Sequence, residues 1–216
     1  MRIESVDLFY LAMPEVLDIG DGSQDALLVR LGAGGHTGWG ECEAAPLVSI
    51  ASLTCPMSHS ACKPVAASVL GQALDSVDDI IRIGNLVREQ SLDLLQADHT
   101  LSGIDMAMWD VLGQRYDTPV YRLLGYDAAF PKIPYASQLF GDTPAETYEK
   151  GRLVTQQGYR AVKFGWGPFG KGDVQSDIDQ VVAAREGIGA DGILLIDAGT
   201  VWVDNVARAA QCLPVL

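Results

Sequence analysis

The sequence predicts an α+β domain over residues 1–127, followed by an α/β domain over residues 128–216. Three observations lead to this division. Alternating apolar residues occupy much of the first 45 positions, as in antiparallel strands, and helical spacing follows as far as residue 116. After Pro131, strand-like and helix-like segments alternate, which is typical of a parallel sheet covered by helices. The stretch 123–125, Leu-Leu-Gly, marks the change between the two patterns.

A three-stranded antiparallel meander is predicted for residues 1–45. Leu27, Val29 and Leu31 alternate along its middle strand, so they should share one buried face. A glycine-rich turn at residues 32–35 leads into the third strand. From about residue 61 the apolar spacing becomes helical, and we expect those helices to complete the α+β domain.

The loop at residues 14–24 separates the first two predicted strands and carries three apolar residues, Val16, Leu17 and Ile19. Such a loop either packs over a neighbouring surface or closes over a ligand site as a lid. On the lid interpretation these three residues contact the substrate, and the glycines of the loop make it mobile. The sequence leaves both interpretations open.

Residues 132–216 repeat a strand followed by a helix three times, with a period of about 28 residues. This period matches an eight-unit (β/α) barrel, so we expect the first three units of such a barrel, apparently truncated. Thr143 and Glu146 predict a capping box at the start of the first helix. The next helix is predicted to run from about Asp173 to Glu186, and Asp204 is the predicted cap of the last one.

A lone lysine and a lone aspartate are predicted on neighbouring strands of this barrel. Alternation places Lys163 on one face with Ala161 and Gly165, and it places Asp197 on one face with Leu195. The carboxyl ends of parallel strands lie beside the loops that form ligand sites. We therefore expect Lys163 and Asp197 to belong to a functional site. A purely structural ion pair is the alternative.

The amino-acid composition excludes several classes of binding partner and indicates the cellular compartment. A net charge of −13 argues against nucleic acid or an anionic membrane surface, both of which need basic patches. No apolar run approaches the ~18 residues of a membrane span. The four cysteines form no CxxC pair and indicate free thiols in a reducing cytoplasm. We expect a cytoplasmic protein, and an anionic substrate would need a bound cation beside it.

Residues 165–170 also satisfy the dinucleotide-binding pattern G-x-G-x-x-G after a strand, with Asp197 ending the next strand. Pro168 removes one of the amides that such a loop offers to pyrophosphate. The helix is predicted to begin after Gly170, and Lys163 puts a charge into a strand that should be apolar. A nicotinamide-dependent oxidoreductase therefore remains only an alternative, and no cofactor-binding residue is assigned.

Four stretches resemble the mandelate racemase/muconate-lactonizing branch of the enolase superfamily: GHTGWGECEAAP (35–46), SGIDMAMWDVLGQRYDTPVYRLLG (102–125), GYRAVKFG (158–165) and LLIDAG (194–199). The resemblance implies an α+β capping domain over a modified TIM barrel. It implies that Asp197 is the first of three carboxylates that hold Mg²⁺. It also implies that Lys163 is a catalytic residue, because the family removes a proton α to a carboxylate with a lysine or histidine base.

The sequence departs from the family's usual motifs twice. On the second barrel strand the family commonly has Lys-x-Lys, where this sequence has Lys163-Phe164-Gly165. On the third strand the family commonly has Asp-x-Asn, where this sequence has Asp197-Ala198-Gly199. We expect the two glycines to open space together, either for a bulkier substrate or for a side chain from elsewhere. Lys163 then orients the substrate carboxylate or acts as a base with extended reach.

The resemblance implies a small carboxylate substrate of the acid-sugar type. Dehydration is the first expectation for the complete protein, with racemisation or cycloisomerisation next. The 216-residue chain supplies one metal carboxylate and one lysine, so we expect it to be inactive by itself. A non-catalytic binding remnant is the alternative. Three barrel strands leave an open edge, from which we expect a homo-oligomer.

Overall fold

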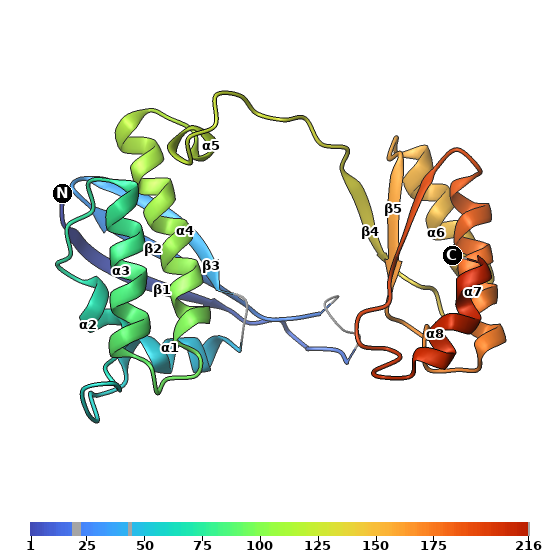
Figure 1. Ribbon diagram of the computed structural model, residues 1–216, viewed down its shortest axis with the longest axis horizontal. Helices are drawn as coiled ribbons and strands as arrows, with labels where there is room; N and C mark the ends of the chain where they lie inside the picture. Colours follow the sequence, from blue (N-terminus) through green and yellow to red (C-terminus); the bar gives the residue numbers. More distant parts are fainter. Residues whose placement is uncertain (19–22, 43–44, 216) are drawn as a thin grey trace. The chain divides into compact units, whose positions relative to one another are not determined.

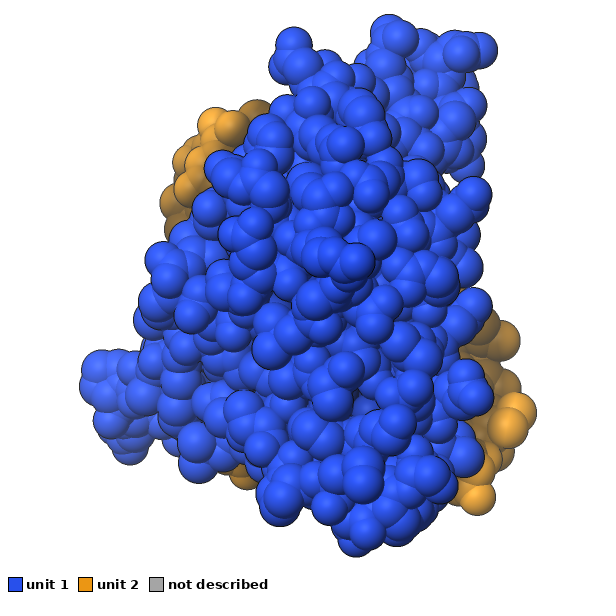
Figure 2. Space-filling view, turned by 90° about the vertical axis from the view of Figure 1, so that its left-hand side faces the viewer, with its two compact units in different colours: residues 1–16, 24–130 blue, residues 17–23, 131–216 orange. Residues whose placement is uncertain are grey.

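The computed structural model describes residues 1–18, 23–42 and 45–215 (Figure 1). The chain forms two compact units, which Figure 2 distinguishes by colour. Unit 1 comprises residues 1–16 and 24–130, and unit 2 comprises residues 17–23 and 131–216. In the described ranges, no helix is both long and apolar enough to cross a lipid bilayer.

Unit 1 begins with an antiparallel sheet of β1 (Ile3–Leu11), β2 (Ala26–Ala33) and β3 (His36–Cys42), in that order. The turn between β2 and β3 consists of Gly34 and Gly35, whose φ angles are +56° and +81°. Two consecutive positive φ angles match the tight hairpin turn that glycine permits most easily. The meander is therefore confirmed, and one face of β2 is fully buried through Leu27, Val29 and Leu31.

The described residues of unit 1 then form the helices α1 (Pro46–Thr54), α2 (Val65–Val69), α3 (Val77–Gln90), α4 (Ala97–Tyr116) and α5 (Val120–Leu123). Helix α4 packs closely on β3, because two glycines of β3 face the helix backbone. A Cβ atom at Gly38 would lie 2.1 Å from the carbonyl oxygen of Ala107, and one at Gly40 would lie 2.0 Å from that of Gly103. Any side chain at these two positions would push the helix off the sheet.

Helix α1 is absent from the sequence prediction, and its burial explains why. Ser49 and Ser52 point into the core, whereas Leu47 and Val48 are exposed. Two of the four buried residues of α1 are serines, so apolar residues mark its buried face only in part. The backbone carbonyl of Ser49 accepts a hydrogen bond from the buried Thr100 hydroxyl at 3.0 Å, which ties α1 to α4.

Unit 2 contains a parallel sheet of β4 (Tyr135–Leu139), β5 (Ala161–Gly165) and β6 (Ile193–Asp197), in that order. Its helices are α6 (Pro144–Gln156), α7 (Val174–Ile188) and α8 (Val206–Cys212), with a 3-10 turn at Leu213–Val215. Helices α6 and α7 lie on one side of the sheet, where Val162 and Phe164 are buried (Figure 1). The expected strand–helix repeat is therefore present three times.

The loops that follow the three strands of unit 2 each send one aromatic residue into the same buried cluster. Phe140 follows β4, Phe169 follows β5 and Trp202 follows β6. Phe169 is fully buried, with ring centroids 4.8 Å from Phe140 and 5.5 Å from Trp202. The glycine-rich loop at 165–170 thus serves to bury a phenylalanine.

Two predicted helix caps differ from the structure. Glu146 accepts the amide of Asp142 at 2.9 Å, one residue before the expected partner, while Thr143 accepts the amide of Glu146 as predicted. The last helix is capped by Asn205, whose side chain accepts the Arg208 amide, rather than by Asp204. Both shifts are one residue long and reflect loop conformations that propensity does not specify.

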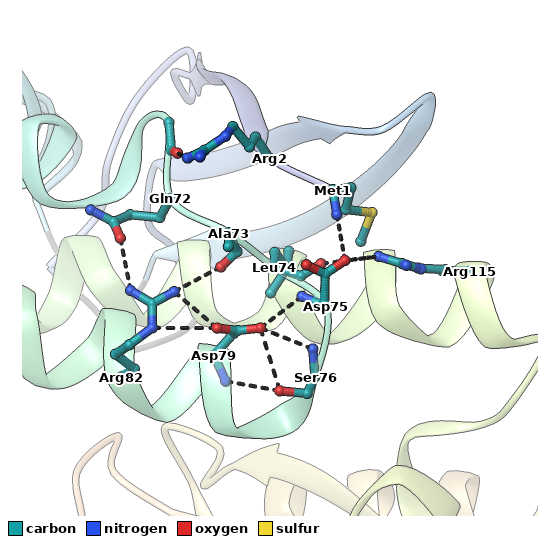
Figure 3. Close-up of polar contacts among 11 residues, drawn as sticks. Met1, Arg2, Gln72, Ala73, Leu74, Asp75, Ser76, Asp79, Arg82 and Arg115 are labelled. Atoms are coloured by element: carbon teal, nitrogen blue, oxygen red, sulfur yellow. Dashed lines mark hydrogen bonds and ion pairs between the residues drawn. The ribbon is translucent and has the colours of Figure 1, made fainter.

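The start of α3 carries a full capping box that holds the chain around Asp79 (Figure 3). The Asp79 carboxylate accepts amide hydrogen bonds from Asp75 at 2.9 Å and Ser76 at 3.2 Å, and it pairs with Arg82 at 3.0 Å. The amide of Asp75 and the guanidinium of Arg82 hold the pKa of Asp79 below its usual value. The charged form of Asp79 therefore stabilises the folded state.

We predict that Asp79→Asn lowers the free energy of unfolding by about 1 kcal/mol at pH 7. Because the folded pKa is lowered, the contribution of Asp79 is fully present above its unfolded pKa of about 3.9, and it is lost as the pH falls through the folded pKa. The difference between wild type and variant should persist from pH 7 to about pH 5 and shrink below about pH 4. Urea titrations at several pH values measure it.

Asp78→Asn is the matched control, because Asp78 lies in the same first helical turn and is exposed. It loses the same interaction with the helix dipole but no cap. A loss of stability in Asp78→Asn equal to that in Asp79→Asn would contradict the capping account.

Candidate active site

The parallel register of β5 and β6 brings Lys163 and Asp197 together. Lys163 is paired with Leu195, and Gly165 is paired with Asp197 at the ends of the two strands. The Nζ atom of Lys163 lies 3.0 Å from Oδ2 of Asp197. Both side chains lie on the face opposite the buried Phe164, so the shared face expected from alternation is present.

The Asp197 carboxylate is held at both oxygens but remains accessible. Its Oδ1 atom accepts the Gly199 amide at 3.0 Å, while Oδ2 contacts Lys163. The side chain of Asp197 is 35% exposed and that of Lys163 is 28% exposed. The carboxylate is therefore fixed in direction and can still reach a ligand.

The ion pair stabilises the charged form of each partner. The hydrogen bond from Lys163 lowers the pKa of Asp197, and the hydrogen bond to Asp197 raises the pKa of Lys163. With no cation at Asp197, the pair therefore favours the ammonium form of Lys163. A close carboxylate outweighs the desolvation that would lower a lysine pKa. The ammonium group also lies 5.3 Å from the centroid of the Tyr135 ring.

A hollow of about 290 Å³ lies over this pair at the carboxyl end of the sheet. Its volume is near the lower end of the range for small-molecule sites. Residues from all three strands and from the loop after β5 line it: Ser137, Gln138, Leu139, Lys163, Gly165, Trp166 and Asp197.

The two glycines that replace polar residues of the motif are tightly enclosed. A Cβ atom at Gly165 would lie 2.9 Å from both Cβ and the carbonyl oxygen of Asp197. A Cβ atom at Gly199 would lie 3.0 Å from two ring carbons of Trp166. We expected the space at these glycines to hold either a bulkier substrate or a side chain from elsewhere. At Gly199 the ring of Trp166 occupies it. Sequence reasoning did not identify Trp166, although a tryptophan directly after a strand end is a usable signal.

One oxygen ligand for a hard cation is present at this site. Carboxylate oxygen suits Mg²⁺, and Asp197 presents one accessible carboxylate. Across the ranges that the structure describes, no group of three or more His, Cys, Asp or Glu side chains is placed to hold a metal ion. The donor type therefore fits Mg²⁺, and the described residues do not complete a set of ligands for it.

Of the three predicted loop residues, two can be located. Val16 and Leu17 are exposed, at 56% and 48% respectively. Val16 lines a hollow of about 430 Å³ in unit 1, beside Tyr10 and Asp25. Leu17 belongs to unit 2, and its amide donates to the Ser23 hydroxyl at 2.8 Å. Ile19 lies outside the described residues.

Comparison with known proteins identifies the family. Residues 11–125 match the N-terminal domain of mandelate racemase / muconate lactonizing enzyme, and residues 147–216 match the enolase C-terminal domain-like family. The chain belongs to the mandelate racemase/muconate lactonizing enzyme family. The predicted resemblance to the enolase superfamily is thereby confirmed, and the matches give no support to the nicotinamide alternative.

Relatives in this family carry several activities. The chain is 35% identical over 120 residues to the 3,6-anhydro-alpha-L-galactonate cycloisomerase of Streptomyces coelicolor. This match covers 54% of this chain and 32% of the relative. It is 30% identical over 175 residues to the D-galactarolactone cycloisomerase of Agrobacterium fabrum. This match covers 76% of this chain and 41% of the relative. Dehydratases of arabinonate and of gluconate/galactonate also match.

Solved structures agree with the fold. A crystal structure of a predicted mandelate racemase from Rhodobacter sphaeroides has a TM-score of 0.92 at 61% identity, and the match covers all of this chain and 55% of that one. The Roseovarius nubinhibens family member complexed with magnesium has a TM-score of 0.77 at 23% identity, over 100% of this chain and 57% of that one. At 23% identity, the similarity to the Roseovarius nubinhibens structure shows a shared fold and nothing more. This chain thus spans little more than half of each.

We predict that Gly165→Ala lowers the free energy of unfolding by about 1–3 kcal/mol, because the new methyl group overlaps Asp197. Gly84→Ala is the matched control, since its Cβ would lie 3.4 Å from the flexible end of Arg88 inside a helix. That variant should be neutral or more stable, as alanine favours helix. Thermal denaturation of both compares them, and an equally stable Gly165→Ala would contradict the close approach of β6.

Proposed function

We propose that these residues belong to a Mg²⁺-dependent enzyme that removes a proton α to the carboxylate of an acid sugar, with dehydration as the reaction of the complete protein. The observation that carries the proposal is the Lys163–Asp197 pair, 3.0 Å apart at the carboxyl edge of a parallel sheet, in a member of this family. Neither residue serves the buried core, so their placement over a hollow favours chemistry over packing.

The acid-sugar class is supported by the relatives. Arabinonate and gluconate/galactonate are the compounds named for the matching dehydratases. Each carries a carboxylate beside a carbon that bears a proton and a hydroxyl group. Cycloisomerisation is the second candidate, because the Agrobacterium fabrum relative that matches 76% of this chain is a D-galactarolactone cycloisomerase.

In this proposal Asp197 is the residue of this chain that holds Mg²⁺. The bound cation would offset the negative charge that develops when the α proton leaves. Asp197 is suited to this role because the Gly199 amide fixes one carboxylate oxygen. Since the chain carries a net charge of −13, such a cation would also permit an anionic substrate to approach.

Lys163 is the proposed catalytic residue. Its raised pKa in the chain without a cation keeps the ammonium group charged, which suits it to attract and orient the substrate carboxylate. Accepting the α proton requires the neutral amine, and therefore a lower pKa than Asp197 alone imposes. Lys163→Arg separates the two roles, because arginine keeps the charge but cannot accept a proton.

A self-associating protein is also proposed. On the sheet face of Lys163, in the described part of unit 2, Tyr135, Ile193 and Leu195 are 46%, 42% and 39% exposed. Apolar side chains on a sheet face favour association with another surface. We propose a second copy of the same protein as one such surface.

The proposed reaction is tested by hydrogen exchange at the carbon next to the carboxylate. These 216 residues would replace the matching 55% of the Rhodobacter sphaeroides protein, with which they share 61% identity. The chimera is incubated in D₂O with Mg²⁺ and a panel of acid sugars, and proton NMR follows loss of the α-proton signal. We predict exchange that falls at least about 100-fold in Lys163→Met and in Asp197→Asn.

Lys132→Met is the control, because Lys132 is exposed and precedes the first strand of unit 2. It should leave the exchange rate unchanged. Exchange that survives in both site variants would contradict the proposed roles.

The 216-residue chain by itself should show no exchange or turnover under the same conditions. One protein carboxylate leaves Mg²⁺ largely hydrated, so it cannot fix the substrate. Turnover by this chain that is abolished by Asp197→Asn would show that one carboxylate suffices.

A further inference from the structure

Trp166 has a backbone conformation that its residue type does not favour. Its φ angle is +55°, in the left-handed region, and the next residue, Gly167, has a φ of +64°. Glycine or asparagine would adopt this turn at lower cost, whereas a bulky aromatic residue is a true outlier there. Strain of this kind concentrates at ligand sites, where the side chain is needed in one direction.

The indole of Trp166 lies beside the charged pair. Two of its ring carbons contact the position that a Cβ of Gly199 would occupy, and it lines the same hollow as Lys163 and Asp197. The side chain is only half-buried. Trp166 also lines a neighbouring hollow of about 620 Å³ beyond the ends of β4 and β5. The ring is therefore placed against the site and still offers surface to a ligand.

Trp202 shows how a structural tryptophan of the same unit differs. Its ring packs on the fully buried Phe169, and its Nε1 donates to Asp177 at 3.4 Å. Unlike Trp166, Trp202 does not have a positive φ angle. Trp202 is thus placed by the core, whereas Trp166 turns toward the Lys163–Asp197 hollow at a cost in backbone strain.

A flat aromatic wall beside a charged pair suits a particular ligand shape. The face of an indole is electron-rich and attracts the weakly positive C–H bonds on one face of a sugar ring. Lys163 and a cation on Asp197 would hold the carboxylate end of the same molecule. An open-chain acid sugar can hold its carboxylate there too, but it presents no fixed C–H face.

We propose that Trp166 is a specificity residue that selects cyclic sugar acids, such as lactones and anhydro sugars, over open-chain ones. This inference rests on the proposed function, since it assumes that a sugar acid binds over Lys163 and Asp197, and it favours the second candidate, cycloisomerisation, over dehydration of an open-chain acid. It goes further by assigning the ring-recognising surface to a residue outside the charged pair.

Saturation-transfer NMR on the chimera with the Rhodobacter sphaeroides protein, which carries all 216 residues of this chain, tests the assignment, because it detects weak binding. D-galactarolactone and D-gluconate, each with Mg²⁺, are the probes, and irradiation of aromatic protons reports which sugar protons contact a ring. In wild type we expect strong transfer to the ring C–H protons of the lactone. Trp166→Leu should lose this transfer and weaken lactone binding by about tenfold, while gluconate binding changes less than about twofold.

Three further variants make the result decisive. Trp166→Phe keeps an aromatic plane and should retain most of the preference for the lactone. Trp39→Leu, at an exposed tryptophan of unit 1, should change nothing. Asp197→Asn should weaken both probes, which tests the carboxylate site on its own. Circular dichroism confirms that each variant is folded.

The outcomes separate the two proposals. Equal binding of both probes by wild type and Trp166→Leu, with loss in Asp197→Asn, would overturn the role of Trp166 and leave the proposed function standing. A preference for the lactone that persists in Trp166→Leu would also overturn it. Absence of binding of either probe to wild type in the presence of Mg²⁺ would count against the proposed function and this inference together.

Discussion

The parallel hydrogen-bond register between β5 and β6 is the constraint on which the site depends. It pairs Lys163 with Leu195 and Gly165 with Asp197, and so sets both charged groups on one face. A shift of one residue would turn Asp197 toward the helix-covered face, where Phe164 is fully buried. An ionised carboxylate there would cost several kcal/mol without a partner. The buried side of the sheet therefore determines which side chains lie on the accessible side.

The aromatic cluster under the sheet strengthens this constraint. Phe140, Phe169 and Trp202 come from the loops after three successive strands and meet in one place. Because each loop begins at the carboxyl end of its strand, the cluster ties together the three ends around the site. The same loops supply Trp166 and Gly199, so the buried cluster and the residues beside the hollow come from the same short segments.

Much of this arrangement could be predicted from the sequence. Alternation alone placed Lys163 and Asp197 on their faces, and the strand–helix period predicted the three units. Such patterns are local, and they are reliable where one face of an element is buried. The predicted roles of the two residues came from the family resemblance rather than from any pattern.

Other features depend on contacts that no local pattern records. Helix α1 buries two serines and is tied to α4 through the backbone carbonyl of Ser49, and the cap of the last helix shifted to Asn205 through the conformation of its loop. The left-handed backbone of Trp166, and its contact with Gly199 more than thirty residues later, are tertiary in the same sense. The raised pKa of Lys163 likewise depended on how closely Asp197 approaches.

The central claim is that Asp197 is a cation-binding carboxylate on the accessible face of the sheet. Substoichiometric Mn²⁺, a paramagnetic substitute for Mg²⁺, tests it by broadening the NMR signals of nearby amides. The account predicts that the amides of Gly199 and Lys163 broaden first, and that Asp197→Asn removes this effect while Asp142→Asn does not. Broadening that begins elsewhere on this acidic chain, or that persists unchanged in Asp197→Asn, would contradict the account.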